Sequence, residues 1–195
     1  HNGRRRQRQM CIRDRTPICD FNLHAIDFKL KSVENTVLSL NDIKGENGTL
    51  IMFICNHCPY VKAIIKDLVE DCEKLKDLGI NSAAIMSNDT INYPDDSYEN
   101  MIKFSAKHKF SFPYLIDETQ EIAKKYDAVC TPDFFGYNKD LKLNYRGRIR
   151  ELRDLKPIRN GTSELFEAMK LISETQKGPD IQKPSLGCSI KWFKK

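Results

Sequence analysis

The strongest constraint on the fold is a change of pattern inside the stretch LIMFICNHCPYVKAI, residues 50–64. Residues 49–54 (TLIMFI) form a continuous apolar run of strand length, which is typical of a strand buried on both faces of a sheet. After Cys58 the apolar positions follow helical spacing as far as Gly79: Val61, Ile64, Ile65, Leu68, Val69, Cys72, Leu75 and Leu78. The sequence therefore predicts a buried strand that leads into an amphipathic helix, with Cys55 and Cys58 at the junction.

The patterns that follow alternate between strands and helices. INSAAIMS and FPYLID are strand-like, and DFFGYN and LKLNYRG flank a hairpin turn at KD. Between them we expect a helix that begins near Asp96, with Asp96 as N-cap and Glu99 as its capping-box partner, and a short helix in ETQEIAKKY. TSELFEAMKLISETQ is a further amphipathic helix. This order predicts an α/β layered domain with a mixed sheet.

The net charge of +5 is concentrated at the N-terminus. Residues 1–15 hold six Arg and one Asp, which accounts for the whole excess. We expect residues 1–15 to be a disordered or non-native basic tail, and residues 16–195 to form one domain. A nucleic-acid-binding arm is the alternative reading of the tail, and we do not favour it. The sequence has no run of eighteen apolar residues, so it predicts no membrane-spanning helix. We expect neither a membrane nor nucleic acid as a partner.

The seven cysteines are an odd number, which argues against complete disulfide pairing. Free thiols together with one catalytic pair fit this count better than complete pairing does. Because free thiols are typical of a reducing compartment, we expect a cytoplasmic protein. The chain starts with His rather than Met, which leaves a lost export signal open as the alternative. Cys72 and Cys19 are predicted to be core thiols.

The junction predicts which cysteine is reactive. Pro59 is suited to the first helical position, which makes Cys58 the N-cap, with the N–H groups of Tyr60 and Val61 near its sulfur. The helix dipole and a protonated His57 would both stabilise a thiolate there. Cys55 is near enough to close a disulfide with Cys58 if the turn permits. Two alternatives stay open: half of a metal site, although there is no second CxxC, and two inert core cysteines.

The ordered motifs TPICDFNL, LIMFICNHCP, FPYLIDETQEIAKKY and VCTPDFFGYNKDLKLNYRGR resemble the thioredoxin-fold superfamily, in its redoxin or AhpC/TSA branch. NHCPYVK together with the terminal GCSIKW resembles a peroxiredoxin-like subfamily that carries a CxxC. The resemblance covers about residues 16–195. It implies a three-layer thioredoxin-like fold with a central mixed sheet, followed by a C-terminal extension.

The resemblance also implies roles for individual residues. Cys58 matches the peroxidatic position, as the cap argument also suggests, and Cys55 becomes the resolving thiol. Thr131–Pro132 matches the cis-proline loop, which faces the cysteines and shapes the substrate groove. Cys130, two residues before Pro132, should therefore approach the site.

Departures from the family pattern limit the expected chemistry. Ile51 stands where peroxiredoxins have Pro, Cys55 where they have Thr, and no Arg precedes CTPDFF where the activating one is expected. Met52 stands where thioredoxins carry a buried carboxylate, so proton transfer to the resolving thiol needs another partner. Arg146 and Arg148 are expected to be solvated. The sequence does not show where the segment that holds Cys188 runs.

We therefore expect a thiol–disulfide oxidoreductase that cycles a Cys55–Cys58 disulfide, with weak peroxidase (antioxidant) activity. Its substrates would be protein or small-molecule disulfides or peroxides, its reductant thioredoxin or glutathione, and no cofactor or metal is expected. One alternative is a chaperone that holds Cu(I) on Cys55, Cys58 and Cys130, since soft thiolates suit that ion. A second is a redox-inactive docking domain.

Overall fold

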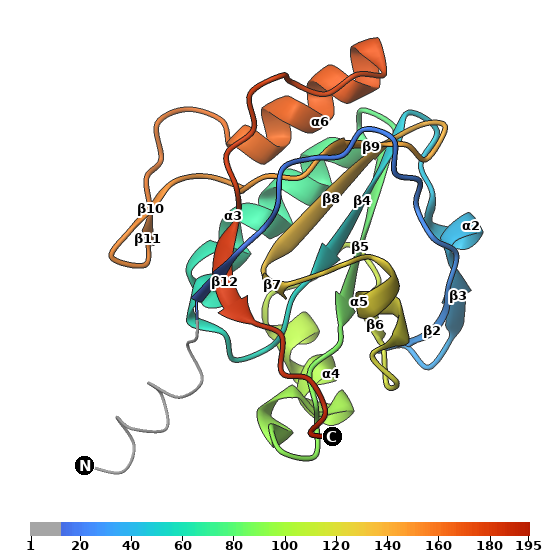
Figure 1. The fold of residues 1–195 in the computed structure, drawn as a ribbon, viewed down its shortest axis with the longest axis vertical. Coiled ribbons are helices and arrows are strands. Elements are labelled where there is room, and N and C mark those ends of the chain that lie inside the picture. The colour runs from blue at the N-terminus through green and yellow to red at the C-terminus, as the bar shows by residue number, and fades with distance from the viewer. Residues whose placement is uncertain (1–12) are drawn as a thin grey trace.

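The computed structural model describes residues 13–195, and Figure 1 shows their arrangement around one central sheet. This mixed sheet has seven strands in the order β3-β2-β6-β5-β4-β8-β9. The strands are β2 (Lys29–Ser32), β3 (Val37–Ser39), β4 (Gly48–Phe53), β5 (Ile80–Met86), β6 (Tyr114–Ile116), β8 (Asp133–Asn138) and β9 (Leu143–Tyr145). β4 pairs in parallel with β5 and antiparallel with β8. The predicted mixed α/β sheet is thus confirmed.

Strand β4 lies at the centre because both of its faces are apolar. Leu50 and Met52 belong to one hydrophobic cluster, Ile51 and Phe53 to the other, and all four are at most 1% exposed. Successive side chains of β4 point to opposite faces of the sheet, and both faces are buried. Each of these four positions is therefore apolar, and the sequence shows an unbroken apolar run instead of alternating apolar and polar residues.

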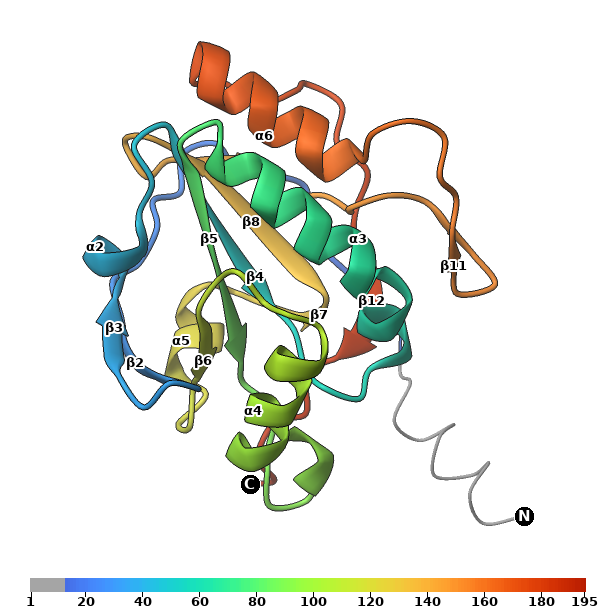
Figure 2. The ribbon, with the colours of Figure 1, turned by 180° about the vertical axis from the view of Figure 1, so that it is seen from behind.

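Helices cover the two faces of the sheet and complete three layers. α3 (Pro59–Lys76), α4 (Tyr98–Lys107) and α6 (Glu164–Thr175) contribute side chains to the cluster that contains Leu50. α2 (Leu40–Ile43) and α5 (Glu121–Lys125) contribute to the cluster that contains Ile51. Figure 2 shows α3, α4 and α6 in front of the sheet when the molecule is viewed from behind.

The start of α4 differs from the expectation. Ser97 is the N-cap, and its side chain accepts from the Asn100 N–H. Asp96, the expected cap, ends a short 3₁₀ turn, η1 (Pro94–Asp96), and is fully buried. Its carboxylate turns inward, where it accepts the Asn56 N–H at 2.8 Å, so it is not available to cap the helix. The predicted Asp96 cap is wrong.

A second, three-stranded sheet has the order β1-β12-β7, with β1 (Arg13–Arg15), β7 (Cys130–Thr131) and β12 (Leu186–Ser189). Residues 13–15, which the sequence assigned to the basic tail, pair antiparallel with Leu186, Gly187 and Cys188. Expectations for the remainder of the tail, including Cys11, lie outside the described residues. A hairpin of β10 (Leu152–Arg153) and β11 (Lys156–Pro157) precedes α6.

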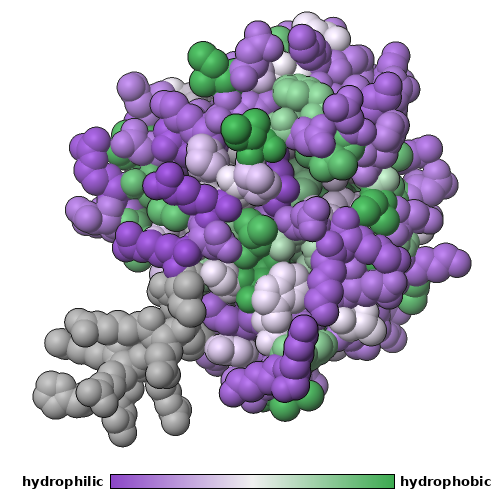
Figure 3. All heavy atoms as spheres, viewed as in Figure 1, coloured by the Kyte–Doolittle hydropathy of each residue, from purple (hydrophilic) through white to green (hydrophobic). Residues whose placement is uncertain are grey.

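Figure 3 shows hydrophobic side chains interspersed among hydrophilic ones on the face of Figure 1. No helix within residues 13–195 is long and apolar enough to cross a membrane.

Candidate active site

The two cysteines lie at the junction of β4 and α3, at the edge of a cavity. α3 begins at Pro59, and Cys58 is its N-cap residue. Cys55 and Cys58 are 1% and 2% exposed. The cavity holds about 460 Å³, and its lining includes Cys55, His57, Cys58, Thr131, Cys188 and Lys191. The predicted placement of Cys58 at the start of the helix is therefore what the structure shows.

Thr131 contacts both sulfurs from the loop opposite. The Thr131–Pro132 peptide bond is cis, and the carbonyl of Thr131 accepts the Cys58 thiol at 3.3 Å. The Thr131 hydroxyl oxygen lies 3.6 Å from the Cys55 sulfur. The loop thus faces the cysteines, in the position that the resemblance implied.

The surroundings of Cys58 favour its thiolate. Burial opposes ionisation of this thiol, but hydrogen bonds with Cys188, Cys55 and Thr131, and then with the Val61 N–H, outweigh burial and lower the pKa of Cys58. The sulfur makes no N-cap hydrogen bond of standard geometry with the first turn of α3. The expected cap contribution from Tyr60 and Val61 is therefore reduced to that of Val61, and neighbouring side chains supply the rest.

Cys55 is shifted in the opposite direction. Burial raises its pKa most, followed by its hydrogen bond with Cys58 and by the negative charges of Asp96 and Cys58. A hydrogen bond between the two sulfurs stabilises the thiolate of Cys58 and the thiol of Cys55, so Cys58 is the first of the two thiols to ionise. The site thus distinguishes a thiol that ionises readily from a partner thiol that stays protonated.

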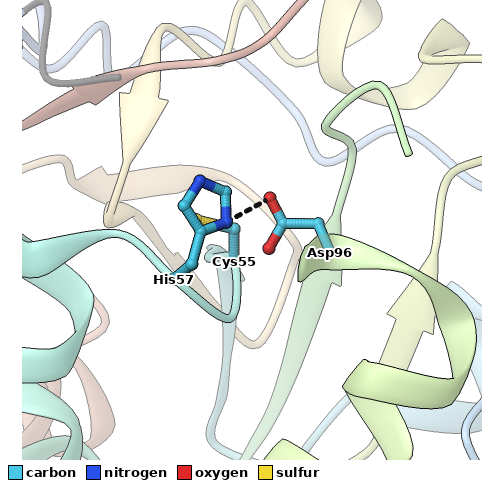
Figure 4. A group of neighbouring side chains, drawn as sticks. All are labelled: Cys55, His57 and Asp96. Atoms are coloured by element: carbon cyan, nitrogen blue, oxygen red, sulfur yellow. Dashed lines mark ion pairs between the residues drawn. The ribbon is translucent and has the colours of Figure 1, made fainter. Parts of the chain in front are cut away.

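His57 and Asp96 lie side by side next to Cys55, as Figure 4 shows. His57 Nδ1 lies 2.8 Å from Asp96 Oδ2, although the N–H is not aligned for a regular hydrogen bond. Asn88 Nδ2 donates to the same oxygen at 2.9 Å. The donor atoms of Cys55, His57 and Asp96 lie within 4.8 Å of one another. His57 is in the site as predicted, and the residue it faces is Asp96, whose place in the site sequence reasoning missed.

Cys130 lies next to the site rather than in it. It is fully buried, and its thiol donates to the Pro132 carbonyl at 3.6 Å. Burial is the main reason that its pKa is raised, and it does not line the cavity. Within residues 13–195 the group of possible metal-ligating atoms found close together is that of Cys55, His57 and Asp96, and not the set of Cys55, Cys58 and Cys130 that the alternative copper-chaperone reading named.

Cys188 is the second functional candidate that sequence reasoning missed. It belongs to β12, sits opposite Thr131 in the antiparallel pairing with β7, and lines the cavity. Gly187 makes this close approach feasible, because a Cβ there would lie 2.1 Å from the Thr131 carbonyl oxygen. The Gly-Cys pair within GCSIKW is the signal that could have indicated a strand packed tightly against another backbone.

Arg146 is buried, which corrects the expectation that it is solvated. It is 3% exposed and makes a two-point contact with Asp133, Nη2–Oδ2 3.0 Å and Nε–Oδ1 3.3 Å. Asp133 directly follows Pro132 and also accepts the Val129 N–H at 3.0 Å. The pair thereby anchors both ends of the loop that carries Thr131. Arg148 is 24% exposed and pairs with Glu164.

The other two expected core thiols are buried. Cys19 is 8% exposed and Cys72 is 1% exposed, and burial raises the pKa of Cys19 to about 11 and that of Cys72 to about 12. Both remain protonated near neutral pH and do not line the cavity, so the prediction of core thiols is confirmed.

Two solved structures are similar to nearly the whole chain. An uncharacterized conserved protein from Geobacillus kaustophilus is 42% identical, covering 93% of this chain and 96% of its own, with a TM-score of 0.88. A hypothetical protein from Sinorhizobium meliloti is 31% identical, covering 92% and 97%, with a TM-score of 0.84. The thioredoxin domain of a thiol-disulfide oxidoreductase from Bacteroides vulgatus is 19% identical, covering 69% and 89%, with a TM-score of 0.55. This last likeness shows the fold alone.

A search of curated proteins gives no significant match. The family comparison is positive, since residues 22–151 match the AhpC/TSA family. This match includes both cysteines of the junction and the loop that carries Thr131. The chain therefore belongs to the AhpC/TSA family, built on the thioredoxin fold.

Proposed function

We propose that this protein is a thiol–disulfide oxidoreductase in which Cys58 is the nucleophile and Cys55 the resolving thiol. The proposal rests on one observation, which is that the pKa values of two neighbouring thiols are shifted in opposite directions. The pKa of Cys58 is lowered while that of Cys55 is raised, at the start of α3 and beside a cavity. A dithiol that ionises at one sulfur only is prepared for ordered attack and resolution.

The first step is attack of the Cys58 thiolate on one sulfur of a disulfide. The S–S bond of the substrate breaks, a mixed disulfide forms on Cys58, and the other half leaves as a thiolate that takes up a proton. Cys55 then loses its proton and attacks the Cys58 sulfur. The products are the Cys55–Cys58 disulfide and two substrate thiols, so two electrons pass from protein to substrate.

Resolution requires a proton acceptor for Cys55, because its thiol is protonated. Asp96 and His57 lie within 4.8 Å of it, and Asp96 is fully buried. We propose that this pair accepts the proton of the Cys55 thiol during resolution. The carboxylate thereby replaces the one that Met52 excludes from the strand. General-base assistance of this kind is worth about 100-fold or more in rate.

Peroxides are the secondary substrates. Attack of the Cys58 thiolate on a peroxide breaks the O–O bond and leaves a sulfenic acid on Cys58, while the other oxygen takes up a proton and leaves as an alcohol or water. Cys55 then converts the sulfenic acid to the disulfide with release of water. Membership of the AhpC/TSA family supports this route. Arg146, occupied by Asp133, is not placed to activate a peroxide, so we propose that the peroxidase rate is low.

The cavity favours a small anionic disulfide as substrate. Its volume of about 460 Å³ falls within the usual range for small-molecule sites, while both sulfurs are almost inaccessible from the surface. Lys62 and Lys191 contribute to its lining, and carboxylates would complement them. Glutathione disulfide has this chemistry. Thioredoxin or glutathione in a reducing compartment would return the oxidised protein to its dithiol form.

A metal-holding role is less well supported. Asp96 Oδ2 already accepts from Asn88 and faces His57, and Oδ1 accepts from the Asn56 N–H. A metal ion would therefore have to displace these protein groups, which uptake of a single proton does not require. In addition, Cys55, which would have to ionise, has a raised pKa.

The test uses the reduced full chain and glutathione disulfide. Peptide mapping by mass spectrometry under non-reducing conditions should show a Cys55–Cys58 disulfide and release of two equivalents of glutathione. The Cys55→Ser and Cys58→Ser variants should each lose that disulfide, and Cys72→Ser serves as the matched control. Failure of the wild-type protein to form the disulfide with any small disulfide would overturn the proposal.

A further inference from the structure

The cavity contains three thiols rather than two, because Cys188 lines it together with Cys55 and Cys58. We propose that Cys188 is a second resolving thiol, which attacks substrate-modified Cys58 and forms a Cys58–Cys188 disulfide. This inference rests on the proposed function of Cys58 as nucleophile. It assigns a redox role to the C-terminal strand β12, which the two-cysteine mechanism does not use.

The register of the small sheet places Cys188 at the site. Cys188 is the antiparallel partner of Thr131, and the Thr131 carbonyl is the group that accepts the Cys58 thiol at 3.3 Å. Cys188 and Cys58 also belong to the same buried cluster, and Cys188 is 3% exposed. Its hydrogen bond with Cys58 contributes to the lowered pKa of that thiol. The two sulfurs are thus direct neighbours on opposite elements.

The strand that carries Cys188 is firmly anchored. Ser185 Oγ donates to the Pro132 carbonyl at 2.7 Å, and the Ile190 N–H donates to Val129 at 3.2 Å. The Lys191 N–H donates to Asn88 Oδ1 at 2.9 Å. These bonds lie on both sides of Cys188 in the sequence. Their effect is to hold its sulfur against the start of α3, which is the condition for an intramolecular attack with high effective concentration.

The chemistry balances with the substrate as oxidant. When Cys58 carries a mixed disulfide, the deprotonated Cys188 attacks the Cys58 sulfur, the mixed S–S bond breaks, and the substrate half leaves as a thiol. When Cys58 carries a sulfenic acid, the same attack releases water. In either case the proton of Cys188 ends on the leaving group, and the net product is one disulfide.

A second resolving thiol gives a product with distinct properties. The Cys55–Cys58 bridge closes a short loop within one junction. A Cys58–Cys188 bridge ties the C-terminal strand to α3 and closes a much longer loop, which restricts the unfolded chain more strongly. Oxidation through Cys188 should therefore raise the melting temperature more than oxidation through Cys55.

The experiment removes the first resolving thiol and asks whether Cys188 replaces it. The Cys55→Ser protein is treated with glutathione disulfide and mapped by non-reducing mass spectrometry. We expect a Cys58–Cys188 disulfide and little retained glutathione. The Cys55→Ser/Cys188→Ser double variant should retain glutathione on Cys58. The Cys55→Ser/Cys130→Ser variant is the control, since Cys130 is buried nearby but outside the cavity, and it should match Cys55→Ser.

Two results would overturn the inference. If Cys55→Ser retains glutathione on Cys58 as long as the double variant does, Cys188 does not resolve, while a Cys55–Cys58 disulfide in the wild-type protein would leave the proposed function intact. If wild-type Cys58 forms neither adduct nor disulfide, both proposals fail. The single Cys55→Ser variant retains Cys188, so its disulfide map decides the matter even if Cys188→Ser does not fold.

Discussion

The Cys58 thiol donates to the Thr131 carbonyl across 3.3 Å, between positions 73 residues apart in the chain. This contact joins the start of α3 to the loop that carries Pro132. Thr131 is also the residue opposite Cys188 in the small sheet, and its hydroxyl faces Cys55. One residue therefore contacts or pairs with the elements that supply all three thiols of the site.

The first prediction concerns which cysteine is the nucleophile. Because the pKa of Cys58 is lowered and that of Cys55 raised, Cys55→Ser should still react quickly with iodoacetamide at neutral pH. Cys58→Ser should react slowly until the pH is alkaline. Rates measured against pH for both variants, with Cys72→Ser as control, test this assignment. A fast phase at low pH that persists in Cys58→Ser would reverse the roles of the two cysteines.

The second prediction concerns the proton acceptor. If Asp96 takes the Cys55 proton, Asp96→Asn should slow the release of glutathione from modified Cys58 by about 100-fold in the Cys188→Ser background, where Cys55 is the remaining resolving thiol. A purely electrostatic role predicts the opposite sign, because the negative charge of Asp96 raises the pKa of Cys55 and its removal would ease ionisation. Single-turnover kinetics distinguish the two. Asp95→Asn, at an exposed neighbour, is the matched control.

The third prediction concerns the buried pair of Arg146 and Asp133. Arg146→Met leaves the buried Asp133 carboxylate without its counter-charge, and such losses cost about 3–5 kcal/mol. Burial already raises the pKa of Asp133, so the uncompensated carboxylate should take up a proton and the destabilisation should shrink as the pH falls. Urea unfolding at neutral and acidic pH measures both effects.

The control for that prediction is the more exposed pair of Arg148 and Glu164. Arg148→Ala should cost about 0–1 kcal/mol, as is usual for surface ion pairs. Equal losses of unfolding free energy in Arg146→Met and Arg148→Ala would show that the buried pair has no special part in holding the loop.

The fourth prediction concerns Gly187. A Cβ at this position would lie 2.1 Å from the Thr131 carbonyl oxygen, so Gly187→Ala should push β12 away from β7. We expect a lower melting temperature. In the Cys55→Ser background we also expect less Cys58–Cys188 disulfide, while Cys58 can still be alkylated. Gly161→Ala is the comparison. Beyond its two chain neighbours, no atom of residues 13–195 lies within 4 Å of its added Cβ, but its φ of +80° strains an L side chain, so it should lower the melting temperature while leaving the Cys58–Cys188 disulfide unchanged. An unchanged disulfide in Gly187→Ala would mean that the strand tolerates the displacement.

The local sequence determined the parts of the fold and site that depend on neighbouring residues. The apolar run in β4 can be satisfied only between two buried faces, and Pro59 starts a helix because it needs no N–H partner there. Together these place Cys58 at the N-cap of α3. The family resemblance added the loop at Thr131 and Pro132, because its motif is also a continuous stretch.

The tertiary structure decided what depends on partners far along the chain. The sequence predicted Asp96 as a helix cap, but its carboxylate accepts hydrogen bonds from the buried Asn56 N–H and the Asn88 amide instead. Arg146 looked like a surface charge until Asp133 supplied a buried counter-charge. Local patterns set the period of a strand or helix, and they do not specify which distant edge it joins. Cys188 enters the site because β12 pairs with β7. Gly187 permits this close approach, but the local pattern does not say which strand is approached.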